Sequence, residues 1–215
     1  MYEFSRGPLV WIAFAVFIIG SIYRLVTIIR LARKEKVIMP YLDFKFGMRS
    51  VLHWLAPFGS RSMRMRPVFS ILSLVFHICL IVTPIFLLGH NLLWKESWNI
   101  IWWTLPENIG NIMAIIVVVI GFFFILRRVA NPTVRFVTSW VDYVFMVIVL
   151  GPFVTGVMAY YQVFDYRIVM MLHMWTGAIW LMAIPFTRVS HMLFFVLTRA
   201  YMGCEFGFVR NARDW

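Results

Sequence analysis

Four of the five histidines in this 215-residue chain lie in two of its long apolar runs. Each run carries two of them: His77 and His90 in residues 68–93, and His173 and His191 in residues 168–197. An ionisable side chain inside a membrane span is costly, which makes it a functional candidate. Imidazole is a common axial ligand of haem iron, although a single histidine can equally form a hydrogen bond between helices. Two histidines on each of two runs favour the ligand interpretation.

The composition places these histidines in a membrane protein. Apolar residues make up 62% of the chain and charged residues 13%, against about 45–50% and about 25% in soluble domains. This excludes a soluble enzyme, a disordered chain and a secreted disulfide scaffold. Cys79 and Cys204 lie far apart and form no C-x-x-C motif, which excludes an iron–sulfur cluster or structural zinc held by this chain.

Five apolar runs are long enough to cross a bilayer, which takes about 20 residues each. We therefore expect an all-α integral membrane protein, organised as a single domain over residues 1–215. Its transmembrane helices are predicted at residues 9–29, 68–93, 109–126, 140–161 and 168–197. Gly151, Pro152 and Gly156 in the fourth of these runs predict close approach of a neighbouring helix.

The basic residues predict the orientation. Segments 30–66, 127–135 and 199–215 carry fifteen Lys and Arg residues, whereas the opposite side carries three. Because basic loops stay in the cytoplasm, we expect the N-terminus outside and the C-terminus in the cytoplasm of a bacterial inner membrane. The net charge of +11 therefore reflects topology, and no nucleic-acid binding is expected.

The first cytoplasmic loop, residues 30–67, is the longest segment outside the predicted spans. Residues 41–58 mix apolar and charged side chains, which indicates an amphipathic surface helix. Arg61, Arg64 and Arg66 precede Pro67, a residue that suits the first turn of a helix. Lipid headgroup binding and docking of a partner subunit both remain open for this basic stretch.

Depth in the membrane pairs two of the histidines near the cytoplasmic face. His77 lies ten residues beyond Pro67, and His191 lies eight residues before Arg199. At 1.5 Å per residue both lie roughly 12–15 Å from the cytoplasmic boundary. We therefore expect His77 and His191 to ligate one haem.

The other two histidines match near the outer face. His90 precedes Lys95 by five residues and His173 follows Arg167 by six, so both lie about 8–9 Å from the outer boundary. Two antiparallel helices would thus hold two haem b groups between facing imidazoles, with the pairs His77/His191 and His90/His173.

The angular positions agree less well with two straight helices. His173 and His191 are 18 residues apart, which places them on one side of a continuous helix. His77 and His90 are 13 residues apart, about 140° from a common face. Pro84 can kink the second helix and change its phase, and Pro185 can do the same in the fifth. A single haem is the alternative to two.

A polar cluster beside His90 is a candidate quinone site. Asn91, Trp94, Lys95 and Glu96 offer groups that can hydrogen-bond a quinone or accept quinol protons, next to an aromatic belt where the ring would enter. The alternative is that Lys95 and Glu96 only end a helix in the headgroup region.

These features resemble a known family. Five spans, a basic first cytoplasmic loop and two histidines on each of the second and last spans resemble the gamma chain of respiratory nitrate reductase, a membrane cytochrome b. The stretch RSVLHWLAPFGS at residues 49–60 and segment 77–94 are more similar to the cytochrome b subunits of sulfate-reducer transmembrane redox complexes of the Tmc, Hmc and Dsr types. The spacing from His77 to His90 is wider than in the nitrate reductase chain.

The resemblance implies a dihaem subunit of a respiratory oxidoreductase complex rather than a complete enzyme. Electrons would pass between menaquinone or a periplasmic multihaem cytochrome c and a cytoplasmic iron–sulfur subunit. The chain would then be part of a hetero-oligomer. A haem-free transporter or proton channel with histidine relays, and a passive membrane anchor, are the alternatives, although no internal repeat typical of transporters is found.

Overall fold

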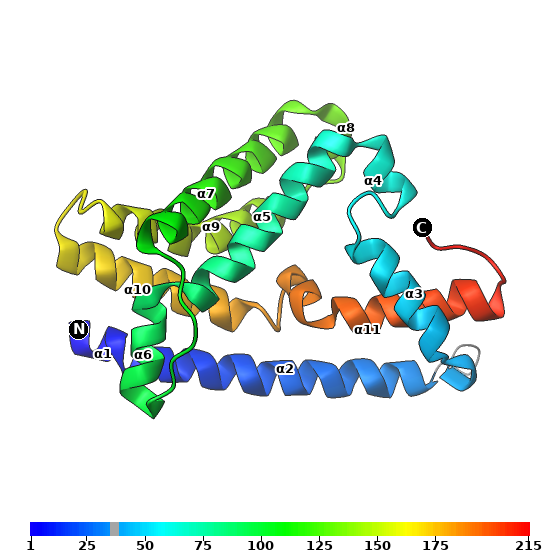
Figure 1. Cartoon of the computed structure of the whole chain (residues 1–215), viewed down its shortest axis with the longest axis horizontal. Coiled ribbons are helices and arrows are strands. Elements are labelled where there is room, and N and C mark those ends of the chain that lie inside the picture. Colours follow the sequence, from blue (N-terminus) through cyan, green and yellow to red (C-terminus); the bar gives the residue numbers. More distant parts are fainter. Residues whose placement is uncertain (35–38) are drawn as a thin grey trace. The chain divides into compact units, whose positions relative to one another are not determined.

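The computed structural model describes residues 1–34 and 39–215, which form helices and loops without a β-strand (Figure 1). Five helical segments are long and apolar enough to cross a membrane: Tyr2–Lys34, Pro67–Phe86, Glu107–Ala130, Trp140–Tyr160 and Arg188–Val209. The all-α class and the number of spans are therefore confirmed, and the chain is a multi-pass membrane protein. The fifth candidate span lies at Arg188–Val209, whereas the sequence predicted it at residues 168–197. Residues 35–38 of the predicted cytoplasmic loop lie outside the described residues. Which face is external stays a prediction.

The chain divides into two compact units. The first contains residues 1–11 and 72–180, and the second contains residues 12–71 and 181–215. Helices α2 (Pro8–Lys34) and α5 (Pro67–Phe86) each contribute residues to both units. The expectation of a single domain came from the sequence organisation and stays a prediction.

The core of the first unit lies where α5, α7 (Glu107–Ala130) and α9 (Trp140–Tyr160) pack together. It is built from Phe76, Cys79, Leu80, Val117, Ile120, Leu150 and Phe153. A Cβ atom added to Gly121 would lie 2.3 Å from Cδ2 of Leu150. A side chain at this position would force Leu150 to move, so glycine favours the close packing of α7 against α9, as is common between membrane helices.

The remaining helices of the first unit are short or carry the histidines. They are α1 (Tyr2–Arg6), α6 (Leu88–Trp98), α8 (Pro132–Phe136) and α10 (Tyr166–Ala183). Asp142, in the first turn of α9, accepts hydrogen bonds from the backbone nitrogen and the hydroxyl of the N-cap residue Ser139, at 2.8 and 3.1 Å. The buried carboxylate therefore has a local role at a helix start.

The second unit is organised around α3 (Phe44–Leu55) and α11 (His191–Cys204), which lie side by side (Figure 1). Small residues allow this contact: a Cβ atom on Gly203 would lie 2.5 Å from Cβ of Ser50 and 2.6 Å from the carbonyl oxygen of Phe46. The predicted surface helix in segment 41–58 is confirmed as α3. The unit also contains η1 (Met39–Tyr41), α4 (Arg61–Met65), η2 (Arg188–Ser190) and the π-helical turn η3 (Glu205–Val209).

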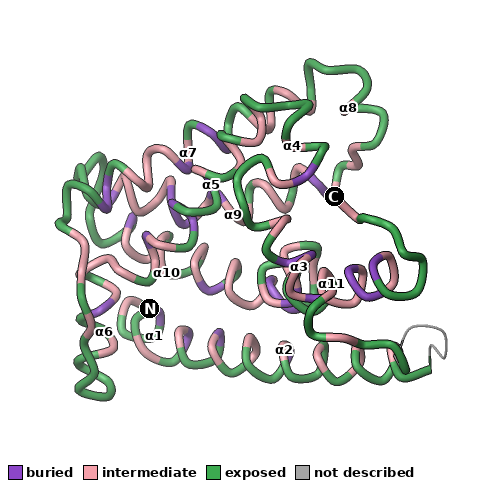
Figure 2. Tube along the Cα trace, turned by 45° about the vertical axis from the view of Figure 1, so that its right-hand side comes forward, coloured by how far each residue is buried: buried purple, intermediate pink, exposed green. Residues whose placement is uncertain are grey.

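Helix α2 exposes most of its surface. Figure 2 shows mainly exposed and intermediate residues along it, and only 11% of the apolar window within Tyr2–Lys34 is buried. An apolar helix of this kind needs lipid or partner helices around it.

The two histidine-bearing runs are each broken, so the prediction of two continuous helices over residues 68–93 and 168–197 is wrong. Helix α5 ends at Phe86 and α6 begins at Leu88, because Leu87 is extended with φ −72° and ψ 134°. Helix α10 ends at Ala183, and α11 begins at His191 after the buried Pro185. Proline lacks the amide donor and clashes with the preceding turn, which favours a break near each of these positions.

Candidate functional site

The structure brings together the imidazoles of His90 on α6 and His173 on α10, both within the first unit. Their ring centroids are 6.0 Å apart and their planes differ by 13°. Both residues are partly buried. The break at Leu87 resolves the difficulty of angular phase, because His77 on α5 and His90 on α6 no longer share a straight helix.

The break also holds the His90 ring. The last carbonyl groups of a helix have no donor within the helix and need other partners. The Nδ1 atom of His90 lies 2.8 Å from the carbonyl oxygen of Pro84 in the last turn of α5. The backbone nitrogen of Leu105 donates to the carbonyl of Phe86 at 2.8 Å. The chain turn therefore supplies the acceptor that orients the imidazole.

Asn91 satisfies the neighbouring carbonyl groups of the break. Its side chain is fully buried, and Nδ2 donates to the carbonyls of Ile85 and Leu87 at 3.1 and 3.2 Å. The indole nitrogen of Trp102 donates to the same Ile85 carbonyl at 2.9 Å. The bond from Asn91 to Ile85 joins the start of α6 to the end of α5, and the bond from Trp102 joins the following loop to the same carbonyl.

The ring of His173 is held by α9. Its Nδ1 atom lies 2.9 Å from the carbonyl oxygen of Pro152 and 3.3 Å from the hydroxyl of Thr155. A Cβ atom on Gly156 would lie 3.1 Å from Cε1 of His173. The close approach predicted at Gly156 therefore involves the histidine-bearing helix α10, which the sequence pattern alone did not specify.

These contacts assign the proton of each ring to Nδ1, since only an N–H group can donate to a carbonyl oxygen. The Nε2 atoms of His90 and His173 then carry the lone pairs that bind metals. Two imidazoles bound to one metal ion with bonds of about 2.0 Å have ring centroids about 6 Å apart. The observed separation and the small angle between the planes therefore fit a pair of axial ligands.

Two glycines on the histidine-bearing helices border open space. A Cβ atom on Gly89, directly before His90, or on Gly177, one turn after His173, would have no heavy atom of a neighbouring element within 4 Å. Among the described residues no group of three or more His, Cys, Asp or Glu side chains could hold a metal ion. Two axial ligands are sufficient for haem, because the macrocycle supplies the others.

The other two histidines also engage backbone carbonyls. Nδ1 of His77 lies 2.7 Å from the Ser73 carbonyl, and Nδ1 of His191 lies 2.8 Å from the Arg188 carbonyl. Both side chains are exposed, which is costly within a membrane span unless another group covers them. His77 belongs to the first unit and His191 to the second, so their pairing stays a prediction from the sequence.

The four residues of the candidate quinone site lie on α6 in different surroundings. The side-chain amide of Asn91 donates to backbone carbonyls at the break between α5 and α6. Trp94 packs on Trp98 and Trp102 with centroid separations of 4.7 and 5.8 Å. Glu96 forms an ion pair with Arg6 of α1 at 2.5 Å, and Lys95 is exposed. The role of these residues toward a quinone stays a prediction.

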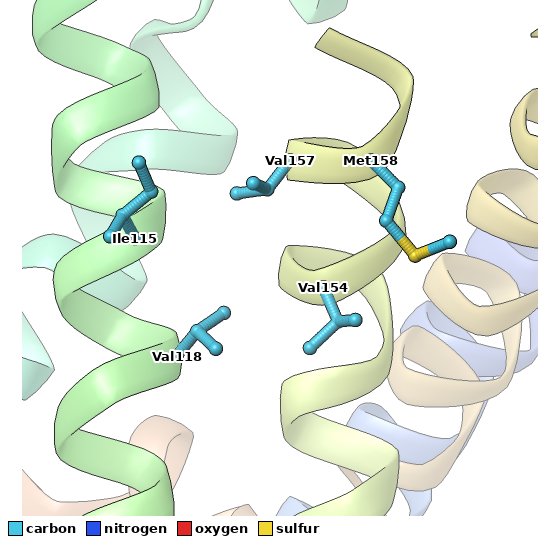
Figure 3. A pocket seen from close by; sticks show the side chains of 5 residues that line it. All are labelled: Ile115, Val118, Val154, Val157 and Met158. Carbon is cyan, nitrogen blue, oxygen red and sulfur yellow. The ribbon is translucent and has the colours of Figure 1, made fainter. Parts of the chain in front are cut away.

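An apolar groove lies between α7 and α9 (Figure 3). Its volume is about 180 Å³, and it is lined by Ile115, Val118, Val154, Val157 and Met158. No lining residue carries a polar side chain, so the groove offers no group for chemistry and suits only an apolar occupant.

The fold and the site together define a multi-pass helical membrane protein with a facing pair of oriented histidines. A protein of Nitratidesulfovibrio vulgaris, described only as a protein, is 32% identical to this chain over 216 residues, covering 98% of the chain and 96% of that relative. The chain therefore belongs to the same family as that protein. No family model matches the chain, and no solved structure matches it.

Proposed function

We propose that this chain is the dihaem b-type membrane subunit of a respiratory oxidoreductase complex in a bacterial inner membrane. It carries electrons across the membrane between the quinone pool, a periplasmic multihaem cytochrome c, or both, and a cytoplasmic iron–sulfur subunit. The cofactors are two haem b groups, and menaquinone is the expected quinone. The membrane location rests on the five candidate spans, whereas the redox role rests on the histidines.

The observation that carries the proposal is the geometry of His90 and His173. A histidine that merely bonds between helices needs one polar partner, and each of these already has a backbone carbonyl at its Nδ1 atom. The two imidazole rings nonetheless lie with their centroids 6.0 Å apart and their planes within 13° of parallel. An axial ligand pair accounts for both the orientation and the spacing.

The chain's own residues would hold and orient the cofactor. The carbonyls of Pro84 and Pro152 fix the tautomers of His90 and His173, and such second partners also raise the basicity of the ligating nitrogen. A bound haem would supply the one-electron chemistry. A haem held by both His90 and His173 would have no open position for oxygen or substrate, which suits electron transfer.

The second haem is proposed on sequence grounds, at His77 and His191, from their matched depths. Haem groups near the two faces would let electrons cross the bilayer in short steps. The basic cytoplasmic segment then faces the iron–sulfur partner, and the Trp-rich outer loop faces the cytochrome c and the quinone.

A reduced-minus-oxidised absorption spectrum of the purified protein tests the proposal. We expect b-type bands, and we expect His90→Ala and His173→Ala each to halve the haem content by removing the same spectral species. His53→Ala is the matched control, because this histidine lies on α3 outside both runs. A wild-type protein without b-type bands would leave the transporter, channel and anchor interpretations.

A further inference from the structure

Helix α1 contacts both helices that carry the facing histidines. We propose that the N-terminal residues 2–11, which we call the clamp segment, hold α6 against α10 and thereby keep the His90 imidazole opposite that of His173. This inference rests on the proposed function, because it assigns the clamp segment a positioning role toward the axial ligands of one haem.

The contact with α10 centres on a buried serine. Ser5 is only 1% exposed, and its hydroxyl oxygen accepts a hydrogen bond from the indole nitrogen of Trp175 at 3.1 Å. The ring of Phe4 packs on Trp175 with a centroid separation of 6.4 Å. Trp175 lies two residues after His173 on the same helix, so its position is directly coupled to that of the ligand.

The contact with α6 uses a charge pair and an aromatic pair. Arg6 binds Glu96 at 2.5 Å, and the indole of Trp11 meets Trp98 edge to face at 4.9 Å between centroids. Glu96 and Trp98 follow His90 by six and eight residues, which is about two helical turns. The clamp segment thus reaches the far end of the helix whose start carries the ligand.

Helix α6 needs these contacts because it is short and buries little of its own surface. It is 11 residues long, and Asn91 is its only buried residue. Helices this short are marginal without tertiary contacts. The break at Leu87 holds its first turn, while its last turns are held by the charge pair and the aromatic pair. Loss of the clamp contacts would leave α6 able to swing about Leu87 and withdraw His90.

The test measures how readily His90 or His173 leaves the iron. Carbon monoxide can bind a reduced haem with two imidazole ligands only after one ligand dissociates. We therefore compare carbon monoxide binding in the wild type and in the Ser5→Ala/Trp175→Phe variant. This variant loses the hydrogen bond between residues 5 and 175 but keeps an aromatic ring at position 175 to pack on Phe4. The haem that His90→Ala removes identifies the signal to follow, and the other haem is the internal reference.

We expect binding at the His90/His173 haem to become about tenfold faster in this variant, because one buried hydrogen bond and its packing no longer oppose ligand loss. The electron paramagnetic resonance signal of the same haem should shift, since it depends on the angle between the imidazole planes. Glu3→Gln, an exposed change on α1, should leave both readouts unaltered. An independent variant, Glu96→Arg, should also raise the rate, and adding Arg6→Glu should restore it.

The outcomes separate the two proposals. A wild-type protein that binds no haem overturns the proposed function and this inference with it. A wild type with haem whose clamp variants bind carbon monoxide at the wild-type rate overturns the clamp alone. Equal acceleration at both haems, together with a lower unfolding temperature, would show general destabilisation and would also overturn it.

Discussion

The imidazole of His173 rests directly on the backbone of α9 at Gly156, where a Cβ atom would lie 3.1 Å from Cε1 of the ring. This approach lets Nδ1 of His173 reach the Pro152 carbonyl at 2.9 Å. Contacts of this length are tighter than ordinary van der Waals packing, so the ring must move if the glycine acquires a side chain. The glycine therefore sets the position of one proposed ligand.

We predict that Gly156→Ala displaces the His173 ring and lowers haem occupancy at the His90/His173 site. Overpacking of this kind costs about 1–3 kcal/mol, which corresponds to a loss in haem affinity of about 5- to 150-fold. Haem titration of the purified variant measures the effect. Val147→Ala, an exposed change on the same helix, should retain wild-type occupancy. Wild-type affinity in Gly156→Ala would show that the ring is not held at this position.

The Asn91 side chain should be essential for the break between α5 and α6. Asn91→Leu keeps the volume but removes two hydrogen bonds, to the Ile85 and Leu87 carbonyls, each worth about 0.5–1.5 kcal/mol. The Ile85 carbonyl then keeps only the Trp102 indole as a donor, and the Leu87 carbonyl keeps only the backbone nitrogen of residue 91. We expect lower thermal stability and loss of the haem bound by His90. Asn108→Ala, at an exposed position, is the control. Unchanged stability and spectra would mean that other groups satisfy the break.

The sequence predicted the elements better than it predicted their interruptions. Apolar run length located the first four spans, and the alternation of apolar and charged residues located α3, whereas the fifth span lies at Arg188–Val209 and not at the predicted residues 168–197. Both signals are local. The position of the first break depends on partners far along the chain, since the amide of Leu105 and the indole of Trp102 bind the carbonyls released near Leu87. A proline at position 84 indicated a kink but could not specify these partners.

In the site, too, local sequence signals were predictive and contacts between distant residues were not. Matched depths paired His90 with His173, and the glycines of the fourth span indicated a close helix contact. The sequence could not predict that the carbonyls of Pro84 and Pro152 orient the two histidines, because every residue has a carbonyl group. The contacts of α1 were equally hidden: Ser5 and Trp175 are 170 residues apart, and neither type signals a long-range partner.

The contact of α3 with α11 should be intolerant of side chains at Gly203. A Cβ atom there would lie 2.6 Å from the backbone oxygen of Phe46, and backbone cannot move aside as a flexible side chain can. We predict that Gly203→Val costs at least about 1–3 kcal/mol and makes the loop around α3 sensitive to protease. The spectrum of the His90/His173 haem should persist. Leu197→Val, exposed on α11, is the control, and equal protease resistance of the two variants would contradict the prediction.

The basic stretch before α5 should contribute to orientation and assembly. Replacing Arg61, Arg64 and Arg66 by Gln removes three charges from the predicted cytoplasmic headgroup zone, each worth about 1 kcal/mol there. We expect weaker partner assembly or a mixed topology, measured by subunit co-purification and by accessibility of a terminal tag. Arg64 also donates to the carbonyls of Phe58 and Gly59 at 2.9 and 2.7 Å.

A double variant separates the effect of the positive charges from the effect of the Arg64 hydrogen bonds. Arg61→Gln/Arg66→Gln removes exposed charges only and retains the hydrogen bonds of Arg64. If charge determines orientation, the double variant should show most of the defect of the triple variant. A defect confined to variants lacking Arg64 would instead point to the local turn, and normal assembly of the triple variant would remove any special role for the cluster.

A quinone site at the outer haem predicts loss of quinol oxidation when the polar residues of α6 are removed. Lys95 is exposed beside the aromatic belt and can donate to a quinone carbonyl. Asn91 has its amide group engaged, and its Oδ1 atom is buried without a hydrogen-bond partner among the described residues, so it can only accept. We expect Lys95→Ala to slow haem reduction by a menaquinol analogue about tenfold, the effect of one lost hydrogen bond to a charged group.

Glu96 requires a separate control because Arg6 binds its carboxylate. Glu96→Ala removes both a candidate proton acceptor and the charge pair with α1, whereas Arg6→Gln removes the charge pair alone. If Glu96 accepts quinol protons, Glu96→Ala should slow haem reduction and Arg6→Gln should not. Equal slowing in both variants would assign the effect to the clamp segment. Full reduction rates and unchanged inhibitor sensitivity in Lys95→Ala and Glu96→Ala would place quinol oxidation elsewhere, at the inner haem or in a partner subunit.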